Sequence, residues 1–422
     1  MIPDGFLKWL RPGMHVKRWL ALLLVGILCL SLGVAYIMTH LYRTQPFPES
    51  AYWVTLQFLD RRLRGLLFLA VGAVFAGVAL WRLSHSLLAP LLPPSGQDGL
   101  ADIVYRYRQL GKGPRIVAIG GGTGLSTLLR GIKAYTSNIT AIVTVADDGG
   151  SSGRLRRELG VLPPGDFRQC IAALAEAEPL VTELFQYRFD QGEGLNGHSF
   201  GNLFIAAMSG ITGNFERALH ESSRVLAVRG QILPSTLEDV VLCAELDDDS
   251  TIEGESQIPH GPAPIKRVYL RPADAQAYPE ALKAIEEAEL IVIGPGSLYT
   301  SIMPNLLVED ITQAIKAARG RKVYVCNVAT QPGETDGYKA RDHVRTLQEH
   351  FGKNLFDYVV INDRVVPMPP EWHVDSLGGR PEALAGLGVR VISADVVEEK
   401  QPTRHNPQKL AQVLLGLVPS QG

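Results

Sequence analysis

The feature that most constrains the fold of this chain is a glycine-rich loop at the end of an apolar, β-branched run. Residues 115–126 read RIVAIGGGTGLS, and a helical segment is expected from Ser126. Glycines allow a tight turn in which backbone N–H groups and a helix N-terminus approach an anion closely. The loop therefore predicts binding of a phosphate or diphosphate by Gly120, Gly121, Gly122, Thr123 and Gly124.

This loop matches neither of the two standard phosphate-binding patterns. The dinucleotide fingerprint requires glycine or alanine where this chain has Leu125. A Walker loop requires a Gly-Lys-Ser/Thr sequence, which does not follow here. Taken by itself, the loop is equally compatible with a plain turn between a strand and a helix.

Composition excludes several classes of protein. The 422 residues carry a formal net charge of −2, so there is no basic excess and nucleic acid is not an expected partner. The four cysteines contain no C-x-x-C pair, which argues against a zinc site and against a disulfide framework. Reduced thiols in a cytosolic domain fit this pattern.

Two apolar runs near the N-terminus predict a membrane hairpin over residues 1–90. Residues 19–42 contain no Asp, Glu, Lys or Arg, and residues 65–81 form a second run. A membrane-spanning helix needs about 20 apolar residues. A cleaved signal peptide and a buried helix are the alternatives. The flanking charges do not decide the orientation. We expect a two-span protein of the cell membrane, with the large domain cytoplasmic because it resembles a metabolite-binding domain.

The rest of the chain alternates between strands and helices. A linker at 91–113 leads to a domain at 114–418, in which residues 166–230 are expected to be mostly helical and 231–270 β-rich. This alternation predicts an α/β fold with a doubly wound, mostly parallel, Rossmann-like sheet, whose ligands bind at the carboxyl ends of the strands. The expected strands are 116–119, 140–145, 290–293, 323–327, 358–361 and 389–392, with helices at 126–133 and 308–318.

An acidic pair follows the second expected strand. Asp147 and Asp148 would lie at the ligand edge, where they could hold ribose hydroxyls or a Mg²⁺ ion against phosphates. Arg154 offers a phosphate contact. Arg156 and Arg157 are interpreted as a solvated basic face of a helix.

Two further polar segments precede helical regions. In PPGDFR, Asp166 is expected to be the N-cap of the next helix, and Arg168 could point back toward the ligand edge. In NGHSFGN, Ser199 is expected to cap the following helix, which would create a second anion-binding helix N-terminus. His198 fits a donor to phosphate or base better than a general base.

Two loops later in the chain repeat the pattern of strand, glycine turn and polar residues. They read GPGSLYTSIMPN at 294–305 and NVATQPGETDGY at 327–338. Several polar, glycine-marked loops at strand ends predict one large polar site. The candidate ligand-binding residues outside the first loop are Asp147, Asp148, His198, Ser199, Asn202, Gly294, Gly296, Ser297, Asn305, Thr330 and Gln331.

These segments carry a resemblance to a known family. Together with GGGTGLS, ADDGGSSGRLR and HSFGN, they resemble the YvcK-type gluconeogenesis factor family, which is similar to CofD, the 2-phospho-L-lactate transferase of deazaflavin cofactor synthesis. The resemblance covers about residues 114–418 and implies a Rossmann-like core. The two N-terminal apolar runs lie outside it and depart from the soluble family pattern.

The resemblance implies two competing functions. YvcK-type proteins are described as binding UDP-activated sugars such as UDP-N-acetylglucosamine, and they are linked to gluconeogenic growth, cell shape and envelope synthesis. A gluconeogenesis factor that binds a UDP-sugar and regulates these processes is therefore the expected function. The alternative is an Mg²⁺-dependent phospholactyl transferase with a guanosine diphosphate-linked donor. An NAD-dependent oxidoreductase is a third reading, against which the missing third glycine argues.

The expected roles of the site residues differ between these readings. In a binding protein, the two glycine loops hold the diphosphate, and Asn202, Thr330 and Gln331 read the base or sugar. In a transferase, Asp148 and Arg168 are the candidate catalytic residues, with Mg²⁺ on Asp147 or Asp148. Whether the protein is an enzyme stays open, and no cofactor is certain. A homo-oligomer and an unidentified protein partner are expected.

Overall fold

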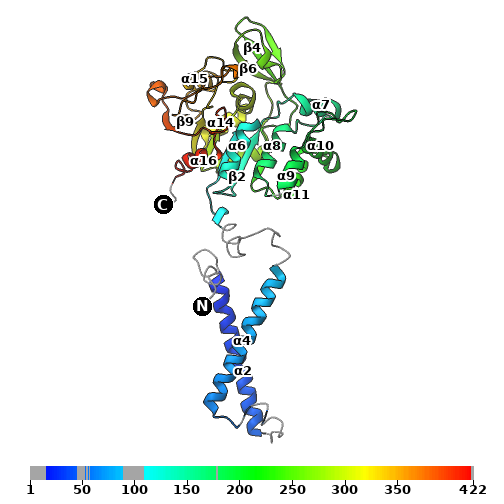
Figure 1. The fold of residues 1–422 in the computed structure, drawn as a ribbon, viewed down its shortest axis with the longest axis vertical. Coiled ribbons are helices and arrows are strands. Elements are labelled where there is room, and N and C mark those ends of the chain that lie inside the picture. Colours follow the sequence, from blue (N-terminus) through cyan, green and yellow to red (C-terminus); the bar gives the residue numbers. More distant parts are fainter. Residues whose placement is uncertain are drawn as a thin grey trace. The chain divides into compact units, whose positions relative to one another are not determined.

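The computed structural model describes residues 16–44, 53, 56, 58–88, 109–176 and 179–419 (Figure 1). The chain divides into two compact units, Met1–Gln109 and Leu110–Gly422. All candidate binding residues lie in the second unit, which is described separately from the first.

The first unit contains two long helices, α2 (Val16–Thr44) and α4 (Arg61–Leu88). They include the runs 19–42 and 65–81, which were expected to span a membrane. A span requires about 20 apolar residues with few charges in one helix. No helix in the described part of the chain is long and apolar enough to meet this requirement. The structure therefore does not support the expectation of two spans.

The second unit is built on a seven-stranded sheet in the order β10-β9-β8-β7-β1-β2-β3. Every neighbouring pair in this sheet is parallel, which confirms the expected α/β class. The central strands β1 and β7 are buried throughout, which accounts for their continuous apolar sequences. The strands are β1 (Ile116–Gly120), β2 (Ile139–Val143), β3 (Gln231–Pro234), β7 (Leu290–Ile293), β8 (Arg321–Val325), β9 (Tyr358–Asn362) and β10 (Arg390–Ala394).

Helices connect and cover these strands (Figure 1). Helix α6 packs against both α8 and α16. The contact with α16 is close, because a Cβ atom at Gly131 would lie 2.0 Å from the carbonyl oxygen of Pro407. The helices are α6 (Gly122–Ile132), α8 (Gly165–Leu174), α12 (Pro279–Glu287), α14 (Glu309–Ala317), α15 (Ala340–Phe351) and α16 (Pro407–Leu415).

The middle of the chain follows the expected division. The expected helical region 166–230 contains α8, α9 (Pro179–Gln186), α10 (Phe200–Thr212) and α11 (Phe215–Val225), and α7 (Gly150–Leu159) precedes it. The β-rich part forms an antiparallel sheet in the order β5-β4-β6, from β4 (Val241–Leu246), β5 (Thr251–Glu253) and β6 (Ile265–Arg271). The aspartates at 247–249 form the turn between β4 and β5. Short helical segments at Leu298–Ile302 and Met303–Leu306, directly after the second glycine loop, were not expected.

Gly131→Ala should destabilise the second unit by about 1–3 kcal/mol, because the added methyl group would overlap the Pro407 carbonyl and force α6 and α16 apart. Urea denaturation followed by circular dichroism measures this change. Gly210→Ala is the matched control, since Gly210 lies in α10 and a Cβ atom added there would meet no other atom within 4 Å. Higher helix propensity should leave the control as stable or up to about 1 kcal/mol more stable. Equal losses in both variants would contradict the packing argument.

Candidate functional site

Several segments meet in one cavity at the carboxyl edge of the parallel sheet. Its volume is about 300 Å³, and it is named the glycine pocket. Residues that follow β1, β7 and β8 line it, together with Val374 after β9 and part of the segment between β10 and α16. The lining residues are Gly121, Gly122, Thr123, Gly124, Thr127, Pro295, Gly296, Ser297, Ser301, Asn327, Val328, Ala329, Thr330, Gln331, Val374, Thr403, Arg404 and His405.

The first glycine loop presents the N-terminus of α6 to this pocket. The N-cap residue Gly121 makes no side-chain capping bond. The buried carboxyl of Asp166 instead accepts a hydrogen bond from the Gly122 N–H. Asp166 was expected to be the N-cap of α8, and this was wrong. Helix α8 begins at Gly165, with Pro164 as its N-cap. Asp166 bonds the first turn of α6 from a neighbouring helix.

The two glycine loops touch each other. A Cβ atom at Gly124 would lie 2.4 Å from the carbonyl oxygen of Pro295 and 2.8 Å from Cα of Gly296. Any side chain at position 124 would therefore push the loops apart. Asn305 supports this arrangement from below, because its Nδ2 donates to the carbonyl oxygens of Gly120 (3.1 Å) and Ser301 (2.8 Å). Asn305 is fully buried and does not line the pocket.

The loop after β8 fixes the second glycine loop. Asn327 accepts a bond from the Gly296 N–H (3.3 Å) and donates to the Gly296 carbonyl oxygen (2.9 Å). Gln331 Nε2 donates to Ser297 Oγ at 2.5 Å. Thr330 bonds to the backbone of Asp375 through both its N–H and its hydroxyl. Gly294 does not line the pocket.

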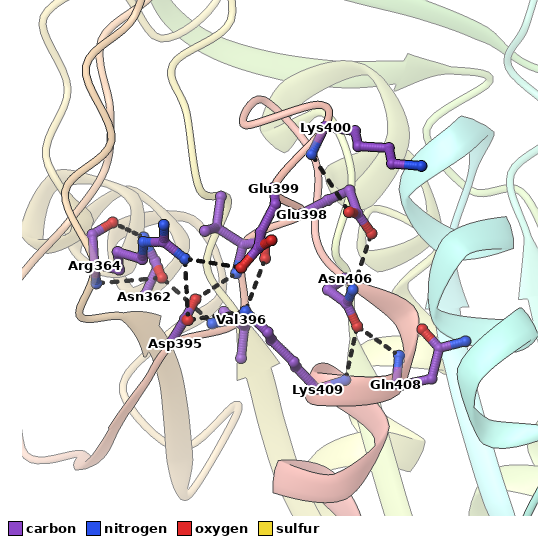
Figure 2. A network of polar contacts seen from close by, with 11 residues as sticks. Asn362, Arg364, Asp395, Val396, Glu398, Glu399, Lys400, Asn406, Gln408 and Lys409 are labelled. Carbon is purple, nitrogen blue, oxygen red and sulfur yellow. Dashed lines mark hydrogen bonds and ion pairs between the residues drawn. The ribbon is translucent and has the colours of Figure 1, made fainter.

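Sequence reasoning did not find the fourth wall of the pocket, which consists of Thr403, Arg404 and His405. This segment is held by a polar network on both sides (Figure 2). On the α16 side, Asn406 is the N-cap and accepts bonds from the N–H groups of Gln408 and Lys409, both at 3.0 Å. The Asn-Pro sequence at the start of α16 is a recognisable capping signal, but it does not reveal which sheet edge the segment reaches.

On the β10 side, the same network is built from ion pairs. Asp395 pairs with Lys409 at 2.8 Å and with Arg364 at 3.5 Å, as Figure 2 shows. Glu398 accepts a bond from Asn406 Nδ2 at 2.9 Å, which joins the two ends of the segment 398–406. The position of Arg404 is therefore set by bonds that flank it on both sides.

The glycine pocket is suited to an anion. None of its lining residues is a carboxylate, and Arg404 contributes a guanidinium group. Burial, and then the charge of Arg404, lower the pKa of Arg130 in α6, so the two cations repel each other. Burial lowers the pKa of His405 to about 4, which leaves this ring neutral at pH 7. Glycines, residues with hydroxyl groups and one arginine therefore line the cavity.

A separate polar network joins α7, α8 and α10 and does not line the glycine pocket. Ser151 Oγ lies 3.0 Å from His198 Nδ1 and accepts a bond from Asn202 Nδ2, also at 3.0 Å. Asn202 Oδ1 accepts from Arg168 Nε at 2.9 Å. Ser199 caps α10, as expected, by accepting a bond from the Asn202 N–H. The structure thus gathers His198, Ser199, Asn202 and Arg168 in one network, and none of the four lines the pocket.

Two of the arginines after the acidic pair have protein partners. Arg156 donates to Asp239 Oδ1 (2.8 Å) and to the Val240 carbonyl oxygen (2.6 Å), which ties α7 to the start of β4. Its expected place on a solvated face was therefore wrong. Arg154 donates to the Asn196 carbonyl oxygen at 2.7 Å.

Five acidic residues form a second electrostatic centre, called the carboxylate cluster: Asp147, Asp148, Asp166, Glu255 and Glu334. The acidic pair separates, because Asp147 accepts from the Gly149 N–H and Asp148 from the Ser256 N–H, both at 2.9 Å. Glu255 and Glu334 were not found from the sequence. Glu334 accepts from Thr300 Oγ1 at 3.0 Å, while its Oε2 is buried with no hydrogen-bond partner among the described residues.

Burial raises the pKa values of four members of the carboxylate cluster. The pKa of Asp166 rises to about 7, with the charge of Asp147 as the second cause. The pKa of Glu255 rises to about 8, through burial and then repulsion by Asp147 and Asp166. Burial also raises the pKa of Glu334 to about 6 and that of Asp147 above its ordinary value. The cluster therefore holds protons near neutral pH.

The carboxylate cluster does not form a preformed metal site. No group of three or more His, Cys, Asp or Glu side chains in the described segments is arranged to hold a metal ion. Asp147 and Asp148, the expected Mg²⁺ ligands, each accept a bond from a different backbone amide. The described residues thus do not fit a magnesium ion held by the protein alone.

These observations define the class of the protein. It is an α/β protein with a pocket at the carboxyl ends of a parallel sheet, and this pocket is suited to an anion. The sequence model described as 2-phospho-L-lactate transferase CofD matches residues 116–397. A relative from Bacillus subtilis, named gluconeogenesis factor, is 50% identical over 315 residues, which cover 73% of this chain and 99% of the relative. The chain therefore belongs to the CofD family, in the group of the gluconeogenesis factors.

Relatives differ in whether they match one unit or both. A Nostoc relative that also has a gluconeogenesis factor name is 49% identical over 98% of this chain and 92% of its own length. The crystal structure of protein BH3568 from Bacillus halodurans is similar with a TM-score of 0.69 and 48% identity. It covers 72% of this chain and 99% of BH3568, so a protein about as long as the second unit folds on its own.

The second unit should lose stability as the pH rises from about 6.5 to 8.5, above the range in which its buried histidines oppose the effect. A carboxyl whose pKa is raised by folding binds a proton more tightly in the folded protein. Its contribution to the free energy of unfolding is therefore fully present below the unfolded pKa and is lost as the pH rises through the folded pKa. For Glu255 this window runs from about 4.5 to about 8. Each proton that is released on unfolding lowers the free energy of unfolding by about 1.4 kcal/mol per pH unit. Urea denaturation of residues 110–422 across this range measures it.

Glu255→Gln should reduce this slope and raise stability at pH 8.5, because a neutral amide removes the repulsion by Asp147 and Asp166. Glu193→Gln is the control, since Glu193 is exposed and lies outside the cluster. A Glu255→Gln variant with the slope of the unchanged protein would show that the cluster does not hold its protons as described.

Proposed function

We propose that the glycine pocket binds the diphosphate of a UDP-activated sugar and that the protein acts as a ligand-responsive gluconeogenesis factor. The observation that carries this proposal is the meeting of two glycine loops, the N-terminus of α6 and Arg404 around one cavity without a carboxylate. Helix N-termini and glycine loops favour phosphate groups, and a guanidinium adds charge-assisted hydrogen bonds.

The two glycine loops suit two linked phosphates. A side chain at Gly124 would overlap Pro295 and Gly296, so the two loops lie directly beside each other where they line the cavity. Arg404 lies on the segment that forms another wall, where the network of Figure 2 restrains it. A cavity of about 300 Å³ is at the lower end of the usual range for small-molecule sites. In this proposal, the diphosphate occupies the pocket and the nucleoside and sugar extend from it.

The polar side chains after β8 would read the rest of the ligand. Gln331 bonds Ser297 and Thr330 bonds the backbone of Asp375, so both are held in place beside the pocket. We infer that they contact the base or the sugar. His198 and Asn202 contact Ser151, do not line the pocket, and would act through the position of α10.

Binding without reaction is sufficient for a regulatory role. A ligand shifts a protein between two states only by binding one of them more tightly. The relatives' names connect the group to gluconeogenesis, and we propose that bound nucleotide sugar reports the supply of envelope precursors to a protein partner. Control of carbon metabolism and cell shape would follow from that interaction.

UDP-N-acetylglucosamine should bind residues 110–422, and Arg404→Gln should weaken this binding by about tenfold or more, because one charge-assisted contact is worth about 1.5–3 kcal/mol. Isothermal titration calorimetry with UDP-N-acetylglucosamine, UDP, uridine and GDP measures it. Arg217→Gln, at an exposed position on α11, is the control and should bind as the unchanged protein does. Equal affinity for uridine and UDP would show that the diphosphate does not anchor the ligand.

Phospholactyl transfer is the second candidate, favoured by the match to the CofD transferase model. Its candidate catalytic residues are Asp148 and Arg168. If binding is the whole function, no breakdown of a guanosine diphosphate-linked phospholactate occurs when a deazaflavin alcohol and Mg²⁺ are added. Turnover that requires the alcohol and is lost in Asp148→Asn would replace the binding proposal by the transferase.

A further inference from the structure

A second cavity lies at the amino edge of the same sheet, where β8, β9 and β10 begin. Its volume is about 570 Å³. Arg321, Tyr358 and Arg390 are the first residues of these three strands, and all three line the cavity. Because the strands are parallel, their first residues lie at one edge. A five-residue strand is about 17 Å long, which separates this edge from the glycine pocket.

This cavity, called the basic pocket, has a large excess of positive charge. Five cations line it, namely Lys316, Arg321, Lys322, Lys353 and Arg390, against the single carboxylate of Asp357. Asp357 is already engaged, since its Oδ2 accepts from the Lys322 N–H at 3.1 Å and lies 3.9 Å from Lys322 Nζ. No carboxylate of the described chain lies within 4.0 Å of the charged groups of Lys316, Lys353, Arg321 or Arg390.

The two arginines are held in fixed positions by neutral groups. Arg321 Nη1 donates to the Leu417 carbonyl oxygen at 2.8 Å, and Arg390 Nη1 donates to the Tyr358 hydroxyl at 3.1 Å. Their guanidinium carbons lie 6.0 and 5.6 Å from the centre of the Tyr358 ring. These cation–π contacts and hydrogen bonds hold both groups without a negative charge, so the remaining N–H donors keep their capacity for an anion.

We propose that the basic pocket binds a small phosphorylated anion with two or more phosphate groups. Like charges gathered in one cavity repel each other, and a polyvalent anion removes that repulsion. The volume lies within the range of small-molecule sites. Two guanidinium groups already lie over Tyr358, so recognition rests on charge and not on stacking of a base. This proposal does not depend on the function proposed for the glycine pocket.

Inorganic pyrophosphate is the probe, and the Arg404→Gln form of residues 110–422 is the background, so that the glycine pocket contributes little. Calorimetry should show pyrophosphate binding that weakens as salt rises. Adding Lys316→Gln and Lys353→Gln should weaken it by about tenfold or more. Lys112→Gln with Lys283→Gln removes the same charge from two lysines elsewhere and should change the affinity less than twofold.

Two results would overturn the proposal. One is equal pyrophosphate affinity in the Lys316/Lys353 double variant and in the Lys112/Lys283 control. The other is binding to phosphatidylcholine vesicles that contain phosphatidic acid, without any binding of pyrophosphate, which would assign the pocket to a membrane surface. Thermal melting of each variant checks folding, and Lys353→Glu alone, at an exposed residue, should weaken pyrophosphate binding more than Lys353→Gln.

Discussion

The close approach of the two glycine loops is the constraint on which the site depends. Gly124 contacts Pro295 and Gly296 with no room for a side chain, and Asn305 fixes the carbonyl oxygen of Gly120 beneath them. This contact sets the width of the glycine pocket, because each loop leaves the carboxyl end of an adjacent strand. The loop after β8 then locks the second glycine loop through Asn327. The pocket is therefore a consequence of three neighbouring parallel strands.

The fold was largely predictable from the sequence. Buried parallel strands need continuous β-branched runs, and such runs at 116–119 and 290–293 are short and clearly bounded by glycine. Polar residues after a strand necessarily share its carboxyl edge, which brought Thr123, Ser297 and Gln331 to one cavity. The family resemblance from the same motifs was confirmed by the comparisons. The membrane spans were not supported, because apolar composition alone does not establish a helix able to cross a bilayer.

The remaining site residues could not be found in this way. Arg404 lies far along the chain in a segment without a glycine signal. Its position depends on the Glu398 N–H bond to its carbonyl oxygen and on the neighbouring contacts of Asn406 with Glu398 and of Lys409 with Asp395. Glu255 follows the antiparallel strands β4 and β5. The alternation of apolar and polar residues in these strands does not show that Glu255 lies near the edge of the parallel sheet. For Asp166 the local sequence gave a wrong prediction. It predicted a cap for the residue's own helix, but tertiary packing directs the carboxyl to α6. Long-range contacts of this kind leave no local pattern.

The position of Asp166 has a consequence for the energetics of ligand capture. Its carboxyl already bonds the Gly122 amide at the N-terminus of α6, and its pKa of about 7 makes it half protonated near neutral pH. An anion that enters the glycine pocket brings negative charge close to this carboxyl, which favours its protonated form. If the glycine pocket binds the diphosphate proposed above, its capture would be coupled to proton uptake by Asp166. The heat of binding would then include the ionisation enthalpy of the buffer and would differ between Hepes and Tris at the same pH.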